Sequence, residues 1–477
     1  MQIANFQSVK ICNWEAKSFV TQTPLIGYFV SHAKKNPIGP FFLRREPPYP
    51  LWWDVAHPRF CNKLRLRRLI QRYVNVSGRT STYRPAELIL ALLYAIIMGL
   101  RRINKTEILQ YNGAFLEMLG LERFPDQSTL RRFLKRLAPK SIRQLVRLHD
   151  SLRAYLFALP HQRNSLVFDV DSTVLIIYGR AEGARVGYNP KKPGRRSYHP
   201  LLCFEEGFQE FWHGSLRPGN AGASTGAVPF LKVCLAKAPS TIARSRMRFR
   251  MDSGFYGSRV IRFLDASGCG YVMVAREYRN IKARARACRF QALSNGWQVA
   301  EFWEKVHHKM MYPHRFVVVR RPIPQDPEDS AQLTLFKDRK YAYHVLVTNL
   351  TLTPWRVYRF YSVRATIEKN IREFVYDYPL GKIPTDTWTA NVAFFQLVLF
   401  AADIVHWFKR LCLPPQYLTT TLDSIRTDFL VLPARMVRES KRNVVKLPHD
   451  YHYQREFLDA SRKVDRLRLP RIFRICK

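Results

Sequence analysis

Acidic side chains are scarce in this sequence, so carboxylates inside apolar segments stand out. The chain has 477 residues, with 78 Lys and Arg against 36 Asp and Glu. Asp169 and Asp171 lie two residues apart in an alternating apolar segment, which puts them on one face of a strand, and Asp252 ends a second such segment. A buried carboxylate needs a cation or hydrogen-bond donors. A pair of Mg²⁺ ions would meet that need and could promote attack on a phosphodiester.

A third carboxylate, Glu368, lies in a segment with helical spacing. Tyr361, Arg364, Glu368 and Arg372 follow one another at intervals of three or four residues, which places them on one face of a helix. A carboxylate in such surroundings can bind a metal ion while its neighbours hold phosphates. Simpler interpretations stay open, because a lone Asp can serve as a turn residue and this helix face can be a solvated row of ion pairs.

The overall charge points to a polyanionic partner. The formal net charge is +42, and 47% of the residues are hydrophobic, which indicates a folded protein with an electropositive surface. The longest apolar stretches, about 88–100 and 392–402, are shorter than the ~20 residues of a membrane span. The cysteines show no C-x-x-C pair, which indicates free thiols in a cytoplasmic protein. No G-x-x-x-x-G-K-[ST] loop is present, so an ATP-driven helicase of that class is excluded.

The elements that carry these residues alternate between strands and helices. We predict strands at about 165–178, 201–205, 209–216, 247–251 and 270–275. One helix is predicted to end near residue 236, and a separate short helix is predicted to start near residue 258. This order predicts a mixed α/β sheet. Residues 276–349 are expected to form β-structure inserted into that core, and two helices are expected to follow, at about 357–374 and 389–410.

The segment before the sheet has helical spacing. Helices are predicted from residue 85, at 106–119, at 130–137 with a cap at 126–129, and at 141–159. Arg131 and Arg132 lie on the polar side of the third of these helices. Short helices of this kind suit DNA docking of the helix-turn-helix type. A helical bundle with solvated Arg and Lys side chains is an equally open interpretation.

Four short segments together carry a family resemblance. They are DVDST at 169–173, GYNPKKPGRRSYHPLL at 187–202, LRPGN at 216–220 and DSGFY at 252–256. With the helical Tyr, Arg and Glu, they resemble the DDE transposases of bacterial insertion sequences. The similar branch has a Y-x2-R-x3-E-x6-K signature and a β-domain inserted before the last acid. The resemblance covers about residues 83–448.

The resemblance implies a ribonuclease-H-like catalytic core with three metal-binding acids. By position these are Asp171, Asp252 and Glu368, with Asp169 as the rival for the first. Tyr361 and Arg364 match the Tyr and Arg of the signature. The Lys of the signature should fall at 375, where this chain has Val375. Either Arg372, about one turn earlier, takes over the phosphate contact, or this copy has lost activity.

Further basic and aromatic residues are candidates for DNA contact. The turn close in sequence to Asp171 carries four of them, and we expect it to track a DNA strand; they are Lys191, Lys192, Arg195 and Arg196. Trp297 in the insertion could stack on an unpaired base, as related enzymes do with flipped bases. Its other interpretation is a core position in a small sheet.

We therefore expect a cytoplasmic, nucleoid-associated bacterial DNA transposase. It would cut element ends and join the 3′-OH to target DNA by two-metal phosphoryl transfer, with two Mg²⁺ ions per site and Mn²⁺ as a substitute. The resemblance adds a hairpin intermediate on the element end and cut-and-paste transposition. The partners would be terminal inverted repeats, target DNA and a second copy of the chain. The alternatives are a catalytically decayed copy that only binds DNA and a nuclease without end specificity.

The domain organisation follows from these segments. We expect an amino-terminal segment at 1–82, a helical DNA-binding domain at 83–160, and the first part of the catalytic core at 161–276. The β-rich insertion would span 277–349, the second part of the core 350–412, and a basic carboxy-terminal segment 413–477.

Overall fold

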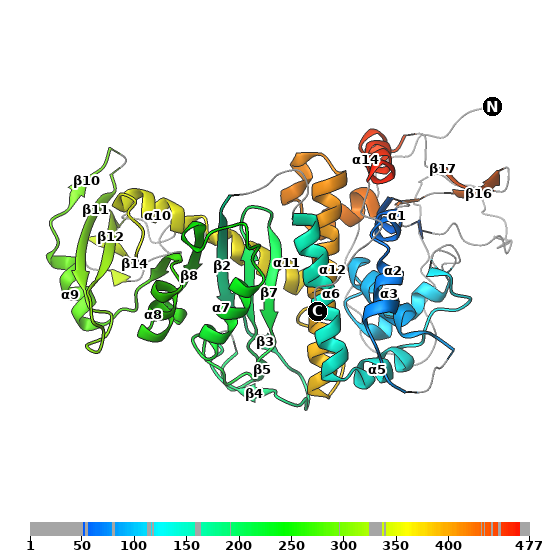
Figure 1. Cartoon of the computed structure of the whole chain (residues 1–477), viewed down its shortest axis with the longest axis horizontal. Coiled ribbons are helices and arrows are strands. Elements are labelled where there is room, and N and C mark those ends of the chain that lie inside the picture. Colours follow the sequence, from blue (N-terminus) through cyan, green and yellow to red (C-terminus); the bar gives the residue numbers. More distant parts are fainter. Residues whose placement is uncertain are drawn as a thin grey trace, which may run out of the picture. The chain divides into compact units, whose positions relative to one another are not determined.

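The computed structural model describes most of the chain from residue 51 onward. The described residues are 51–52, 56–78, 82–111, 116, 119–157, 164–190, 192–294, 296–323, 336–337, 340–430, 432–433, 435–439, 442–446 and 450–467. All of them belong to one compact unit, 49–477. Its centre is a mixed sheet with helices on both faces (Figure 1).

The described strands of the sheet follow the order β10-β11-β12-β14-β9-β8-β2-β6-β7, with β13 paired to β14. Their bounds are β2 Leu166–Ser172, β6 Leu201–Glu205, β7 Glu210–Ser215, β8 Met247–Met251, β9 Gly270–Val274, β10 Gln291–Ala292, β11 Gln298–Glu304, β12 His314–Pro322, β13 Phe336–Lys337 and β14 Tyr341–Thr348. In the half from β7 to β9, β2, β6 and β7 form an antiparallel meander, and β8 and β9 continue parallel to β2. This is the order of a ribonuclease-H-like core, and the predicted fold class is confirmed.

The strands after β9 extend the same sheet. β14 pairs antiparallel with β9, and β12, β11 and β10 follow outward from β14. Each of these strands is antiparallel to its neighbour. They form the β-structure that the sequence predicted for this segment. The inserted strands and the catalytic core therefore share one continuous hydrogen-bonded sheet.

Helices cover both faces because each strand alternates its side chains between them. On one face lie α7 Ala227–Ala236, α8 Ser258–Ala266 and α9 Arg279–Ala287, packed on Phe168, Val170 and their neighbours. On the other lie α10 Pro354–Ser362, α11 Ala365–Tyr376 and α12 Trp388–Cys412. Because Asp169 and Asp171 alternate with Phe168 and Val170, the two acids face α10 and α11.

The helices before the sheet share a hydrophobic core with α12. They are α1 Ala56–Lys63, α2 Leu66–Tyr73, α3 Pro85–Ile97, α5 Gln127–Arg136 and α6 Pro139–Phe157, with the 3₁₀ helix η1 Ile103–Tyr111. Every residue of α3 from Ala86 to Ile97 except Glu87 is buried, and α3, α5 and α6 all contact α12. This arrangement joins the predicted helical domain to the second part of the core through one cluster.

Among the described helices, α12 alone is long and apolar enough to cross a membrane, but 78% of its most apolar stretch is buried in the protein. Its polar residues have partners within the fold. Asp403 bonds His149 at 2.7 Å and accepts a hydrogen bond from the Phe211 N–H at 2.8 Å, and Gln396 donates to the Gly214 carbonyl at 3.0 Å. Since a polar group without partners is costly in an apolar setting, these contacts identify α12 as a core helix.

The remaining described elements lie around this framework. They are the three-stranded sheet of β3 Leu175–Ile176, β4 Arg185–Val186 and β5 Arg196–Tyr198, the pairs β1 Leu51–Trp52 with β15 Leu432–Pro433 and β16 Arg435–Glu439 with β17 Arg442–Lys446, the short helices η2 Arg244–Arg246, η3 Ser253–Phe255, η5 Pro415–Thr419, α13 Leu422–Ile425 and η6 Arg426–Leu430, and α14 Gln454–Arg466. Two motif glycines are required here. A Cβ on Gly187 would lie 2.0 Å from the Gly219 carbonyl oxygen, and one on Gly219 would lie 2.1 Å from that of Ser197. The GYNP and LRPGN segments therefore pack backbone to backbone.

Several local predictions were wrong. The segment after β9 contains a helix, α9, where only β-structure was expected; its apolar residues Ile281 and Ala285 are four apart and both buried. The segment expected to be helical from 106 begins as the 3₁₀ helix η1. Asp126 makes no capping hydrogen bond to α5, because its carboxylate pairs with Arg123 at 3.2 Å. The single helix expected at 357–374 is two helices, α10 and α11.

Candidate active site

Asp171 and Asp252 lie at the carboxyl ends of two neighbouring parallel strands. In the register of β2 and β8, Asp169 pairs with Arg250 and Val170 with Met251, so Asp171 and Asp252 come next along the two strands. The Ser172 N–H donates to Asp171 at 2.7 Å, and the Gly254 N–H donates to Asp252 at 3.0 Å. Each carboxylate is thereby held by the backbone that follows it.

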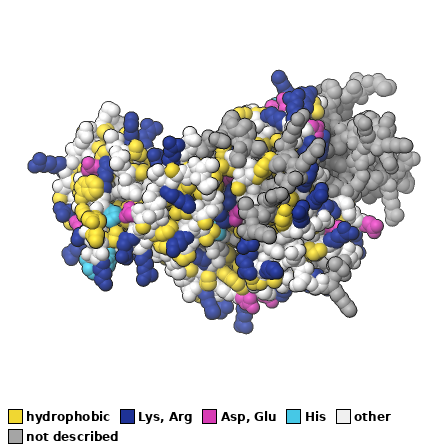
Figure 2. All heavy atoms as spheres, viewed as in Figure 1, with side chains coloured by type: hydrophobic (Ala, Val, Ile, Leu, Met, Phe, Trp, Pro, Cys, Tyr) yellow, Lys and Arg dark blue, Asp and Glu magenta, His cyan; other side chains and the backbone are white. Residues whose placement is uncertain are grey.

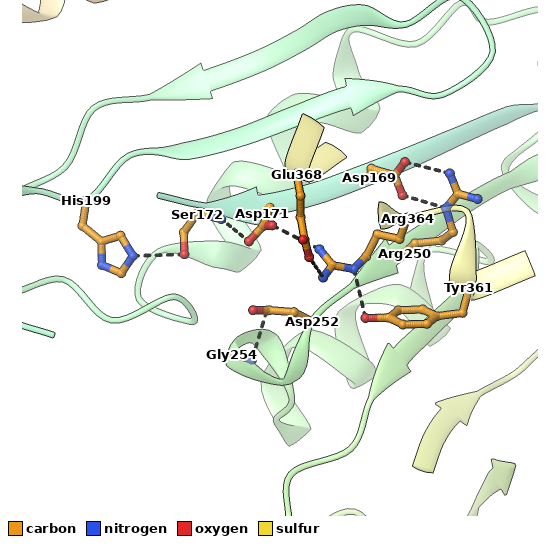
Figure 3. Close-up of polar contacts among 10 residues, drawn as sticks. All are labelled: Asp169, Asp171, Ser172, His199, Arg250, Asp252, Gly254, Tyr361, Arg364 and Glu368. Atoms are coloured by element: carbon orange, nitrogen blue, oxygen red, sulfur yellow. Dashed lines mark hydrogen bonds and ion pairs between the residues drawn. The ribbon is translucent and has the colours of Figure 1, made fainter. Parts of the chain in front are cut away.

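A guanidinium lies among the three predicted acids. Arg364 donates to Asp171 at 3.1 Å and to Glu368 at 3.4 Å, and its Nε donates to the Tyr361 hydroxyl at 2.9 Å. Figure 3 shows Asp171, Asp252 and Glu368 around this side chain. Arg364 is 7% exposed, whereas the Glu368 side chain is 57% exposed. The structure therefore brings four of the sequence-predicted residues together at the ends of β2 and β8.

The break between α10 and α11 positions this group. The N–H groups of Arg364, Thr366 and Ile367 bond to carbonyls three residues earlier, which tightens the chain into a 3₁₀-like turn. Tyr361 ends up at the end of α10 and Glu368 in the first turn of α11. Their side chains still meet Arg364, as the spacing predicted, although the helix is not continuous.

Burial governs the charge of the two aspartates. It raises the pKa of the Asp171 carboxyl to about 7, with Arg364 opposing and Asp252 adding to the rise. It also raises the pKa of Asp252, again against Arg364. Burial alone would lower the pKa of Arg364, but Tyr361 and the two aspartates raise it above its usual range. Two partly desolvated carboxylates thus share one permanent positive charge.

Asp169, the rival first acid, has a different setting. Arg250 binds it with two hydrogen bonds, Nε to Oδ1 at 2.6 Å and Nη2 to Oδ2 at 2.7 Å, and donates its third to the Phe360 carbonyl at 2.9 Å. Asp169 is 2% exposed and Arg250 1%. This closed ion pair favours Asp171 as the acid that is free to bind a ligand.

Sequence reasoning missed three residues that support the site. Arg250 stands two residues before Asp252. A basic residue inside an apolar strand was the sequence feature that could have identified it. His199 lies in the SYHP part of the second motif, and its ring nitrogens contact Ser172 Oγ at 3.0 Å and the Ala221 carbonyl at 2.6 Å. Arg217 from the LRPGN segment donates to the His199 carbonyl at 2.8 Å. These contacts hold the chain that follows Asp171.

The three acids of the site are candidate ligands for a divalent metal ion. In the part of the chain that the structure describes, no three His, Cys, Asp or Glu side chains come together closely enough to hold a metal ion. Arg364 supplies the reason, because its guanidinium separates Glu368 from Asp171. The three acids nevertheless offer only carboxylate oxygens, which hard cations such as Mg²⁺ prefer. The donor chemistry of the three acids fits a divalent cation, whereas the position between Asp171 and Glu368 is taken by the Arg364 guanidinium.

The predicted DNA-contacting residues fall into separate places. Lys192 and Arg195 are exposed between β4 and β5, Arg196 is exposed at the start of β5, and Lys192 donates to the Tyr178 hydroxyl at 3.2 Å. Lys191 lies outside the described residues. Arg131 and Arg132 lie on α5, whose Leu130, Phe133 and Leu134 are buried in the shared core. Arg131 donates to the Pro384 carbonyl at 3.3 Å, which ties α5 to the loop after α11.

The last three candidates differ in exposure. Arg372 is exposed on α11. Val375, at the position of the signature Lys, is half-buried and packs against the hydrophobic core. Trp297 lies among Trp355, Tyr358 and His344, with ring centroids 5.7, 5.2 and 6.5 Å away. This aromatic packing fits the core interpretation of Trp297.

Comparison with known proteins assigns the family. No curated protein matches the sequence. Among solved structures, the chain is similar to one titled "Cryo-EM structure of piggyBac transposase synaptic complex with hairpin DNA (SNHP)", at 12% identity and a TM-score of 0.39, covering 79% of this chain and 86% of that one. The family model described as transposase DDE domain group 1 matches residues 58–469. That match includes both strands and both helices of the site, and the chain belongs to the transposase DDE domain group 1 family.

Proposed function

We propose that this chain is a DNA transposase that cuts element ends and joins the freed 3′-OH to target DNA. The observation that carries the proposal is the meeting of Asp171 and Asp252 at the ends of two parallel strands, with Glu368 and Arg364 brought to them by the turn between α10 and α11. In this proposal Asp171, Asp252 and Glu368 hold two Mg²⁺ ions, or Mn²⁺ as a substitute. When bound, such ions activate the attacking oxygen and stabilise the leaving oxygen at a phosphodiester.

The other side chains have roles that their positions support. Arg364, released from the acids, would donate to a phosphate oxygen, because a guanidinium binds phosphate as readily as carboxylate. Tyr361 would orient Arg364 through the hydrogen bond to its Nε. Glu368 is exposed enough to turn toward the strand ends. Arg372, exposed on the same helix, would contact a second phosphate in place of the Lys that Val375 replaces.

The finer features follow from the bacterial insertion-sequence branch that the sequence resembles. They are the Y-R-E-K signature, here without its Lys, a hairpin on the element end, a cut-and-paste outcome and a homodimer that pairs two inverted repeats. The hydrolytic and joining steps exchange phosphodiester bonds, so neither step requires a nucleotide energy source. The protein would act in the cytoplasm at the nucleoid.

One observation favours a second function, a decayed copy that binds DNA without cutting it. Val375 packs against the hydrophobic core where the signature has a Lys. A Lys at this position would have to extend from a half-buried site to reach a phosphate. The loss of that contact and the retention of the acids are compatible with either function. A measurement of DNA cleavage must therefore distinguish the active transposase from the decayed copy.

The test is metal-dependent cleavage of the DNA that flanks the gene, in Mg²⁺ and then Mn²⁺. We expect discrete end-specific cuts by the wild type and none by Asp252→Asn, with equal DNA binding by both. Asp459→Asn, the same change on the exposed side of α14, is the control and should cut normally. Binding without cuts in either metal would favour the decayed copy, and equal cleavage by wild type and Asp252→Asn would reject the catalytic assignment.

A further inference from the structure

A cationic groove lies beyond the active site, between three segments that are distant in sequence. Its walls are α5, the segment 176–181 after β3, and the loop 381–386 after α11, with the start of η1 at one end. Its volume is about 660 Å³. Six of its lining side chains are positively charged: Arg102, Arg131, Arg132, Lys135, Arg180 and Lys382.

The negative charge in the groove is already neutralised. Asp386 is the carboxylate among the lining residues, and Lys135 binds it at 2.6 Å. Arg102, Arg180 and Lys382 are exposed, and within the described residues none of them forms an ion pair with a carboxylate. Since like charges gathered in a concave surface attract and concentrate a polyanion, the groove suits an anionic occupant with several charges.

The walls are held together, so the groove is a built feature. The Glu182 N–H donates to the Asp386 carbonyl at 2.8 Å, and the Trp388 N–H donates to the Glu182 carboxylate at 2.7 Å. Arg131 joins α5 to the Pro384 carbonyl. These bonds fix the two segments and the helix relative to one another before any ligand binds.

Two of the walls continue from the elements that carry the catalytic candidates. The segment from Asp171 to Arg180, which lines the groove, spans nine residues and thus at most about 32 Å. The loop 381–386 follows α11, which carries Glu368. One base pair of B-DNA rises about 3.4 Å, so this reach corresponds to at most about ten base pairs. Lys and Arg side chains are also widespread on the face of the protein drawn in Figure 2.

We infer that this groove binds the phosphate backbone of a DNA duplex within about ten base pairs of the phosphodiester held at Asp171 and Asp252. The position of the cut in this statement rests on the proposed function, whereas backbone binding in the groove does not. The charged lining of the groove suits a sugar–phosphate strand that lies along it. It sets the register of the DNA without reading its sequence.

The test uses the full chain with Arg102→Gln, Arg180→Gln and Lys382→Gln combined. Affinity for a fluorescent duplex of about 20 base pairs from the gene's flanking DNA is measured between about 50 and 200 mM NaCl. We expect the slope of log K against log salt to fall by about 2.7, since each phosphate contact contributes about 0.9. The control removes three exposed charges on the opposite side of the sheet, with Lys232→Gln, Arg246→Gln and Arg259→Gln, and should change the slope by less than one such contact.

Two further measurements keep the test decisive. The charge-preserving variant Arg102→Lys with Arg180→Lys should retain the wild-type slope, which separates loss of charge from misfolding. Phosphate ethylation within about ten base pairs of the cut should weaken binding by the wild type and have little effect on the triple Gln variant. Equal slopes for the groove and control variants would overturn the inference. A triple Gln variant that lost binding of a mononucleotide but kept the wild-type slope for the duplex would also overturn it. The slope is readable even if the wild type never cuts DNA, so failure of the groove and failure of the catalytic proposal are distinguishable.

Discussion

Two clusters of carboxylate and guanidinium lie on the same face of the sheet, two residues apart along β2. In the first, Arg250 grips Asp169 with two bonds of 2.6 and 2.7 Å, and both residues are almost fully buried. In the second, Arg364 reaches Asp171 at 3.1 Å and Glu368 at 3.4 Å, and Glu368 is largely exposed. We call these the closed pair and the open cluster (Figure 3).

The difference shows how the same residue types serve different ends. The closed pair has one acid for one base and no remaining space, so its charge is balanced within the fold. The open cluster has three acids for one base, and burial raises the pKa of Asp171 and Asp252, as it also raises that of Asp169 in the closed pair. Excess negative charge at a partly accessible site calls for an added cation. We therefore expect substitutions in the closed pair to affect stability and those in the open cluster to affect chemistry.

The largest expected effect is on cleavage by Asp171→Asn. Removal of a metal-binding carboxylate should lower the rate of end cleavage by about 10⁴-fold, or about 5.5 kcal/mol. The thermal unfolding midpoint should not fall, because burial disfavours the charged form of this side chain and Asn is neutral. Single-turnover cleavage and calorimetry measure the two quantities. A variant that cuts normally but unfolds early would make the open cluster a structural feature like the closed pair.

Asp169→Ala should have the opposite profile. It leaves the buried Arg250 without its carboxylate, which is expected to destabilise the fold by about 3–5 kcal/mol. Urea unfolding gives the value, and Asp459→Ala at the exposed pair with Arg462 is the matched control, at ~1 kcal/mol or less. Metal-dependent cleavage per folded molecule should persist. A stable Asp169→Ala protein that has lost cleavage would instead restore Asp169 as the first acid.

Arg364→Gln sharpens the comparison by removing the base from the open cluster. Without a competing cation, Mn²⁺ affinity in the absence of DNA should rise about tenfold, which is about 1.4 kcal/mol. Cleavage should still fall, because a phosphate contact is lost. Titration followed by electron paramagnetic resonance measures the affinity, and Arg372→Gln on the exposed side of α11 should leave it unchanged. Weaker Mn²⁺ binding by Arg364→Gln would mean that Arg364 orients the acids and does not compete with metal.

The smallest effect is a dependence of cleavage on pH that arises from the open cluster. Asp171 must lose its proton to bind a cation, and its pKa is raised to about 7. At limiting Mg²⁺, cleavage should therefore rise by up to about tenfold per pH unit below 7 and level off above it. Saturating Mg²⁺ should move the midpoint to lower pH, since metal binding favours the carboxylate. A flat profile from pH 6 to 8 at limiting Mg²⁺ would contradict the role of Asp171.

Local patterns predicted much of the fold and the choice of site residues. Strands β6 and β8 were predicted with their observed bounds and β9 to within one residue, because alternation with a period of two persists along them. The strand predicted at 165–178 is instead β2, which ends at Ser172, followed by the separate short strand β3. The same alternation placed Asp169 and Asp171 on one face, opposite Phe168 and Val170. The intervals between Tyr361, Arg364 and Glu368 predicted their contact, and that contact survives the break between α10 and α11.

Other features depended on partners that are distant in the sequence. Arg250 was not recognised as the partner of Asp169, because 81 residues separate them and only the pairing of β2 with β8 joins them. The helix α9 was missed because its short, strongly basic sequence has few apolar residues, and packing on the insertion strands stabilises it. The core role of Trp297 depends on α10, which follows it by more than fifty residues.

The amino-acid sequence by itself determined the strands, the carboxylates at their ends and the excess of positive charge, because each is a property of neighbouring residues. The tertiary structure decided which acid is neutralised and which remains open, since that depends on whether Arg250 or Arg364 reaches it from another element. It also decided where the surface charge is concentrated. Arg102, Arg180 and Lys382 are unremarkable in the sequence and share a groove only because α5 packs beside the loops that follow β3 and α11.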